Sequence, residues 1–153
     1  MKNKICIIGL GYVGFPLFLE LKKKKFKVIG YDNNEKKIKK FKKNFFFPKK
    51  IIFTSSKSDI KNSNVYVICV PTPLNKFREP DLSIVLNSAS RIKDHIKKDQ
   101  LIILESSTYP GTTSEVLSYE LEKSSLKANK DFFIAYSPER EDPGNKKFSN
   151  DKI

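Results

Sequence analysis

Three glycines near the N-terminus have the spacing of a loop that holds a phosphate group. Gly9, Gly11 and Gly14 form a G-x-G-x-x-G pattern that follows an apolar run and precedes an amphipathic stretch. In such a loop the first glycine permits a tight turn, the second lets the backbone approach a pyrophosphate, and the third allows close packing of a helix on a strand. The first-turn N–H groups of the helix then face the anion. The pattern therefore predicts a dinucleotide site.

An acidic residue lies where the adenosine ribose of a dinucleotide would need one. Asp32 ends the second apolar run, 18 residues after Gly14. A carboxylate there accepts hydrogen bonds from ribose hydroxyls and repels a 2′-phosphate, so we expect NAD rather than NADP. Lys36 and Lys37 follow closely and could still tolerate a phosphate. The alternative is a glycine-rich turn without a ligand, in which Asp32 only caps a helix.

The elements that must position these residues follow from the alternation of apolar runs with amphipathic stretches. Six runs are predicted as strands, over 4–9, 27–32, 51–54, 65–70, 101–105 and 131–136. Helices are predicted over 12–25, 35–43, 82–98 and 113–126, the third with Asp81 or Ser83 as its N-cap. Strands that are apolar on both faces and alternate with helices indicate a covered parallel sheet. We therefore predict an α/β fold, a Rossmann-type doubly wound parallel sheet in a single domain.

Composition argues against several other classes of protein. The 153 residues, 39% of them hydrophobic, suffice for one folded domain but not for two ordinary ones. No apolar run nears the roughly 20 residues that span a bilayer, so we expect no membrane partner. Cys6 and Cys69 lie within strand-like runs. We therefore expect no disulfide framework, no metal site and a cytoplasmic location.

The net charge of +13 suggests a polyanionic partner as another hypothesis. Thirty residues are Lys or Arg and 17 are Asp or Glu, but only three of the basic residues are Arg. A nucleic-acid-binding face more often uses Arg with interleaved aromatic residues. We interpret the charge as a Lys-rich solvated surface and expect no nucleic acid as partner.

Three loops rich in hydroxyl and carboxylate groups follow predicted strands. They are VPTPLNKFREPDLS (70–83), ESSTYPGTT (105–113) and YSPEREDPGN (136–145). In a doubly wound sheet, ligands bind outside the carboxyl ends of the strands. We expect the loops to form one cofactor and substrate rim above the glycine loop, whereas single residues such as Ser83 or Thr113 are expected to be only caps.

Together with GLGYVG (9–14), these loops resemble the nucleotide-sugar 6-dehydrogenase family of UDP-glucose and GDP-mannose dehydrogenases, most of all its UDP-N-acetylglucosamine 6-dehydrogenase branch. The resemblance spans nearly the whole chain. It implies the N-terminal NAD-binding domain of an enzyme for surface polysaccharide biosynthesis. Such an enzyme oxidises the C6 alcohol of a UDP-sugar to a carboxylate with two NAD, through a thioester on a cysteine. The family dimerises largely through its middle domain, so this portion is expected to be monomeric.

The resemblance also implies roles for single residues. Those assigned to NAD are Gly9, Gly11, Tyr12, Val13, Gly14, Asp32, Thr72 and Thr108. The two threonines would lie on the nicotinamide side, and Thr108 would also hold the water used in oxidation. Glu139 would act as a catalytic base toward the sugar and the hydrolytic step, with Arg140 beside it at the substrate.

Two departures from the family pattern matter. The connection between 43 and 51 is shorter than expected, which puts the third strand and the adenine side of the pocket in doubt. The family's nucleophilic cysteine does not occur in these 153 residues, and Cys6 and Cys69 lie in strands where a thiolate would be costly.

We therefore expect a Rossmann domain over 1–136 and an exit segment over 137–153 that leads toward a middle domain. The chain alone should bind NAD without oxidising a sugar. A stand-alone, non-catalytic NAD-binding module is the alternative.

Overall fold

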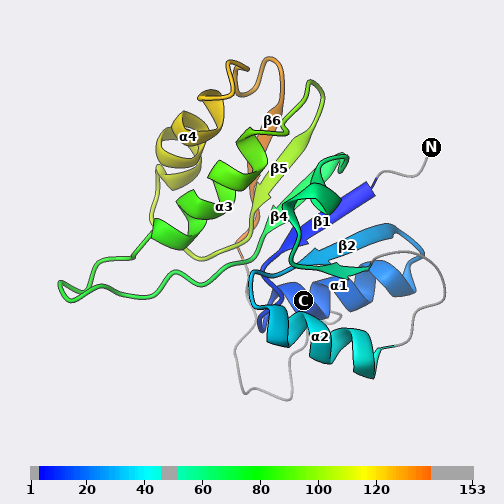
Figure 1. The fold of residues 1–153 in the computed structure, drawn as a ribbon. Coiled ribbons are helices and arrows are strands. Elements are labelled where there is room, and N and C mark those ends of the chain that lie inside the picture. The colour runs from blue at the N-terminus through cyan, green and yellow to red at the C-terminus, as the bar shows by residue number, and fades with distance from the viewer. Residues whose placement is uncertain (1–3, 46–51, 139–153) are drawn as a thin grey trace.

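The computed structural model describes residues 4–45 and 52–138, in which six strands form one parallel sheet (Figure 1). The strands lie in the order β3-β2-β1-β4-β5-β6. Their bounds are β1 (Lys4–Ile8), β2 (Lys27–Tyr31), β3 (Phe53–Thr54), β4 (Val65–Ile68), β5 (Leu101–Leu104) and β6 (Phe133–Tyr136). This order reverses direction between β1 and β4, as in doubly wound dinucleotide-binding sheets. The predicted Rossmann-type α/β fold is confirmed.

Helices cover both faces of the sheet (Figure 1). The first pair, α1 (Gly14–Lys23) and α2 (Glu35–Asn44), lies on one face. The second pair, α3 (Ser83–Lys93) and α4 (Ser118–Glu122), lies on the other, and a π-helical segment, η2 (Thr112–Leu117), leads into α4. A 3₁₀ turn that the sequence did not predict, η1 (Lys57–Ile60), precedes β4. Among the described residues, no helix has the length and apolar character needed to cross a membrane.

The two faces have separate hydrophobic cores because successive strand residues point to opposite sides. Ile7 packs with Phe18 and Ile38 under α1 and α2. Its neighbour Ile8 packs with Val85 under α3. The strands of the sheet centre therefore read as continuous apolar runs, which is what predicted them from the sequence.

The third strand forms despite the short connection before it. The Gly30 N–H donates to the Ile52 carbonyl at 2.6 Å, and the Asp32 N–H donates to that of Thr54 at 3.1 Å. The rings of Phe15 and Phe41 stack at 4.5 Å, and Phe45 and Phe53 lie against them. This cluster packs α1 and α2 together beside β3, so the doubt about the third strand is not borne out.

Helix ends differ from the predicted ones for local reasons. The third helix ends at Lys93 rather than at 98, and Asp99 beyond it has a left-handed φ of 63°. At its start, neither Asp81 nor Ser83 is the N-cap; Leu82 occupies that position. The Asp81 carboxylate instead accepts the N–H of Ser83, the first residue of α3, at 2.8 Å. A capping side chain would accept an N–H from the second or third residue of the helix.

Strand β6 departs from the expected burial on both faces. Its Phe133 and Tyr136 are 48% and 44% exposed. The strand lies at the edge of the sheet, and in the described ranges no further strand pairs with its outer side. Burial of an edge strand depends on what lies beside it, which an apolar run cannot reveal.

Candidate functional site

The glycine loop joins β1 to α1 at the carboxyl edge of the sheet, and its three glycines have different surroundings. Gly9 has a φ of +92°, and a Cβ there would lie 2.6 Å from the Cys69 carbonyl oxygen. At Gly14 a Cβ would overlap the Gly9 carbonyl oxygen. The chain's own packing therefore requires both glycines. At Gly11, by contrast, a Cβ would meet no atom within 4 Å. Nothing in the described fold accounts for a missing side chain at that position.

Backbone amides next to Gly11 face no acceptor. The N–H groups of Tyr12 and Val13 donate no hydrogen bond to any residue that the structure describes. Val13 is the N-cap of α1, no side chain caps the helix there, and Pro16 in the first turn has no N–H at all. Unpaired N–H groups at a helix start carry the positive end of the helix dipole. The loop therefore has the N–H groups of an anion-binding site, as the glycine spacing predicted.

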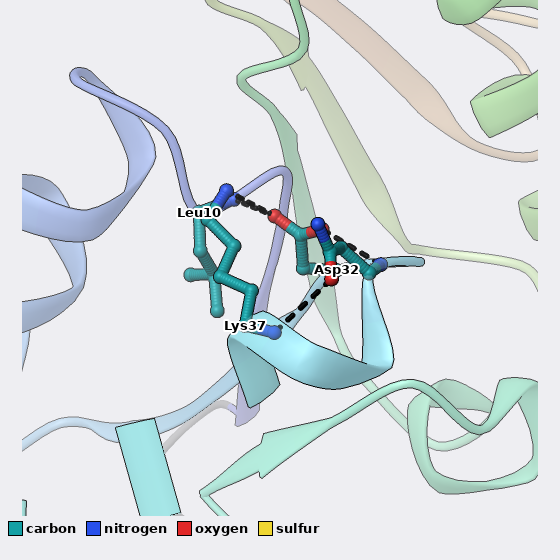
Figure 2. Close-up of polar contacts among 4 residues, drawn as sticks. Leu10, Asp32 and Lys37 are labelled. Atoms are coloured by element: carbon teal, nitrogen blue, oxygen red, sulfur yellow. Dashed lines mark hydrogen bonds and ion pairs between the residues drawn. The ribbon is translucent and has the colours of Figure 1, made fainter. Parts of the chain in front are cut away.

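Asp32 follows β2 directly and turns its carboxylate toward the glycine loop (Figure 2). One carboxylate oxygen, Oδ2, accepts the Leu10 N–H at 3.0 Å and the Lys37 ammonium at 2.7 Å. The other, Oδ1, accepts the Asn34 N–H at 3.0 Å. The side chain is thus fixed between the loop that follows β1 and the first turn of α2.

The protonation of Asp32 follows from these contacts. Burial by itself raises its pKa, but the Lys37 ammonium and the N–H groups of Asn34 and Leu10 outweigh burial and hold the pKa below its ordinary value. The carboxylate is therefore charged at neutral pH. It is not the cap of α2, because Asn34 is the N-cap and accepts the Lys37 N–H at 3.1 Å. The alternative of a mere cap therefore does not describe this residue.

A hollow of about 370 Å³ opens beside the Asp32 carboxylate. Gly9 and Lys37 line it from the side of the glycine loop and α2, and Pro71 lines it from the loop after β4. The opposite wall is α3, through Asn87, Ser88 and Arg91. Of the two lysines that follow Asp32, only Lys37 is part of this lining. The α3 residues were missed in the sequence, although their helical spacing was a signal for one shared face.

The loops after β4 and β5 are tied together at the same edge of the sheet. The Thr72 hydroxyl donates to the Ser107 carbonyl at 2.7 Å, and the Ser106 hydroxyl donates to the Val70 carbonyl at 2.7 Å. Thr72 therefore lies against the loop that carries Thr108, as the rim hypothesis expected. Thr108 itself lines a second hollow of about 480 Å³, together with residues of η2 and β6.

The remaining predicted residues contribute differently or lie outside the described ranges. The Tyr12 side chain is 84% exposed, and Val13 packs against the core under α1. Only their backbone N–H groups therefore point to an anion site. Glu139 and Arg140 lie beyond the described residues.

Both cysteines are buried, Cys6 within β1 and Cys69 directly after β4 rather than in the predicted strand. Cys6 has no exposed surface, and Cys69 is 6% exposed. Burial raises the pKa of the Cys6 thiol far above its ordinary value and outweighs the nearby Lys4 ammonium, which lowers it. A buried thiol of this kind is inert as a nucleophile.

Comparison with known proteins assigns the glycine loop and its surroundings to a family. The model of the UDP-glucose/GDP-mannose dehydrogenase family, NAD binding domain, matches residues 3–152. The chain belongs to this family. The cofactor of this family's domain is NAD, which agrees with the open space at Gly11 and with the charged Asp32 carboxylate beside the loop.

Individual relatives agree with this assignment. Protein CapL of Staphylococcus aureus is 39% identical, with 95% of this chain and 37% of the relative covered. UDP-N-acetyl-D-glucosamine 6-dehydrogenase of Pseudomonas aeruginosa is 37% identical, with 94% and 36% covered. Among solved structures, UDP-D-ManNAc dehydrogenase of Pyrococcus horikoshii superposes with a TM-score of 0.83 at 33% identity, covering 92% of this chain and 37% of that one. The chain thus spans little more than a third of these relatives and corresponds to their NAD-binding portion.

Proposed function

We propose that this chain supplies the NAD-binding portion of a nucleotide-sugar 6-dehydrogenase that oxidises the C6 alcohol of a UDP-sugar to a uronate. The observation that carries the proposal is Gly11, where the fold leaves open space beside free backbone amides. The names of the relatives support a UDP-N-acetylhexosamine as substrate. The resemblance of the four motifs supports a place in surface polysaccharide biosynthesis.

The pyrophosphate of the cofactor would rest on the glycine loop. The N–H groups of Tyr12 and Val13 would donate to its oxygens, and the open space at Gly11 would let the phosphates approach the backbone. Gly9 and Gly14 would act indirectly, because they allow the turn and the close contact with Cys69, directly after β4, that hold these amides in place.

The adenosine ribose would lie against Asp32. A carboxylate has about four acceptor positions, of which three are used by Leu10, Asn34 and Lys37. The remaining position, or the one that Lys37 now holds, would accept a ribose hydroxyl. The negative charge would also disfavour a 2′-phosphate, although the adjacent Lys37 ammonium weakens that repulsion.

The nicotinamide would lie toward Thr72 and Thr108. NAD supplies a hydride acceptor for the alcohol carbon. The hydrogen bond from the Thr72 hydroxyl to the Ser107 carbonyl would hold the loops after β4 and β5 in one arrangement around the nicotinamide ring. Thr108 would orient a water near the sugar. Glu139 would take up a proton in the hydrolytic step, with Arg140 at the sugar.

The sugar-oxidising activity would need more than the described residues provide. The family chemistry runs through a thioester on a cysteine, and both cysteines of this chain are buried, Cys6 in β1 and Cys69 directly after β4. We therefore propose a Rossmann domain over 1–136, followed by a segment over 137–153 that leads toward the substrate-binding part. A non-catalytic NAD-binding module is the second candidate, favoured by the same burial of both cysteines.

Calorimetric titration of NAD into the 153-residue chain tests the proposal. We expect saturable binding of one NAD, and loss of that binding in Gly11→Leu with the fold intact by circular dichroism. We also expect no NADH to form when UDP-N-acetylglucosamine is added. A folded chain that does not bind NAD would contradict the proposal. Formation of two NADH per UDP-sugar by the chain alone would show that the full oxidation to the uronate does not need the expected cysteine.

The two candidate functions differ in what the coding sequence should hold after Ile153. A downstream frame with a helical domain and a cysteine-containing loop supports the dehydrogenase. A stop codon directly after Ile153, together with NAD binding, supports the module.

A further inference from the structure

One face of α3 forms the wall of the hollow opposite Asp32. Ile84, Asn87, Ser88 and Arg91 line the hollow at positions i, i+3, i+4 and i+7, which lie on one side of a helix. The Ser88 hydroxyl is used within the helix, since it donates to the Ile84 carbonyl at 2.9 Å. Arg91 is thus the cationic group that α3 contributes to this wall.

Arg91 is held in place by the residue that precedes Asp32. Its Nη1 donates to the Tyr31 hydroxyl at 2.5 Å, and its guanidinium carbon lies 5.8 Å from the centroid of the Tyr31 ring. Tyr31 is 2% exposed and packs in the core under α3. The buried Tyr31 ring therefore fixes the Arg91 guanidinium at the edge of the hollow. Tyr31 directly precedes Asp32, whose carboxylate is proposed to bind the ribose.

No carboxylate neutralises Arg91 within the described part of the chain. Its neighbour on the helix, Lys93, by contrast pairs with Glu120 at 3.0 Å. An arginine stays charged and presents a planar face, which stacks well on aromatic rings. Arg91 therefore combines a fixed position, an unpaired charge and a flat surface in the wall of the hollow beside Asp32.

We propose that the guanidinium of Arg91 is the surface on which the adenine base of NAD stacks, with Tyr31 as its positioning residue. The inference rests on the proposed function, because Asp32 and the glycine loop set the direction of the cofactor. With the pyrophosphate at Gly11 and the ribose at Asp32, the base extends away from the loop toward α3. Every purine base has a π-face, so stacking on a guanidinium needs no further hydrogen bond.

Binding measurements on the full 153-residue chain test this assignment. Arg91→Met keeps most of the apolar stem but removes the planar cation, and we expect it to weaken NAD and 5′-AMP alike by about 3- to 30-fold. Arg91→Lys keeps the charge without the plane and should lose an intermediate amount. Tyr31→Phe removes only the hydroxyl that holds the guanidinium and should show a smaller loss. Lys97→Ala, which removes an exposed charge beyond α3, serves as the control and should bind as the wild type does.

The results separate this inference from the proposed function. If Arg91→Met binds NAD and AMP with wild-type affinity, adenine stacking on Arg91 is wrong while NAD binding stands. If Arg91→Met loses affinity for NADP but not for NAD, Arg91 contacts a phosphate rather than the base. If Arg91→Met does not fold, Arg91→Lys and Tyr31→Phe decide the matter by the same criteria. A wild-type chain that binds neither NAD nor AMP overturns both proposals.

Discussion

Alanine substitutions at Gly11 and Gly14 should affect the stability of the fold differently. At Gly11 the new Cβ meets no atom within 4 Å, and the backbone is outside the left-handed region. Because alanine restricts the unfolded chain, Gly11→Ala should leave the free energy of unfolding unchanged or raise it by up to about 1 kcal/mol. At Gly14 the Cβ overlaps the Gly9 carbonyl oxygen and lies 3.0 Å from the Cys69 Cβ. Gly14→Ala should therefore lower the free energy of unfolding by about 1–3 kcal/mol or more.

Gly11→Ala should weaken NAD binding although it leaves the fold stable. In Gly11→Ala the methyl group occupies the space assigned to the pyrophosphate, so NAD affinity should fall by about 5- to 150-fold. Urea unfolding followed by circular dichroism gives the stability, which suits a chain without tryptophan, and calorimetry gives the affinity. The reasoning is refuted if Gly11→Ala unfolds as easily as Gly14→Ala, or if it binds NAD as tightly as the wild type.

Other predictions concern Asp32 and the cysteines. Asp32→Asn should weaken NAD binding and narrow its preference over NADP, measured by competitive titration of the two cofactors. Because contacts in the folded state lower the pKa of Asp32, its stabilisation is complete above about pH 5 and is lost as the pH falls below about 4. Urea midpoints from neutral to acid pH should therefore decline less steeply in Asp32→Asn than in the wild type, and equal declines would contradict this. Cys6 and Cys69 should react with a thiol reagent only after urea unfolding, and rapid labelling of the native chain would show that burial does not protect them.

The sequence predicted the sheet well because its strands are buried on both faces. Ile5 to Ile8 and Val65 to Ile68 are continuous apolar runs, and such runs need no partner to be recognised. Helix ends were predicted less well. The third helix was predicted to reach 98 but ends at Lys93, before a turn in which Asp99 is left-handed. Such endings depend on local hydrogen bonds, which periodicity does not contain.

Within the site, the sequence predicted what a motif encodes and missed what the fold brings together. Gly11 and Asp32 belong to a local pattern with a known spacing. Arg91 is 59 positions after Asp32 and meets the same hollow only because α3 covers the face of the sheet on which Tyr31 lies. The pairing of Asp32 with Lys37 follows from the first turn of α2, which directs that ammonium back toward β2. Contacts of this kind need three-dimensional neighbours, and one sequence does not supply them.

The most direct test of the account is whether NAD contacts the amides of the glycine loop. In a ¹H–¹⁵N correlation spectrum of the chain, the Gly11, Tyr12 and Val13 signals should shift saturably on addition of NAD or of ADP-ribose, which carries the same pyrophosphate. Nicotinamide alone should leave them unchanged. If these signals stay fixed while NAD binds and shifts others, the pyrophosphate lies elsewhere and the central claim is wrong.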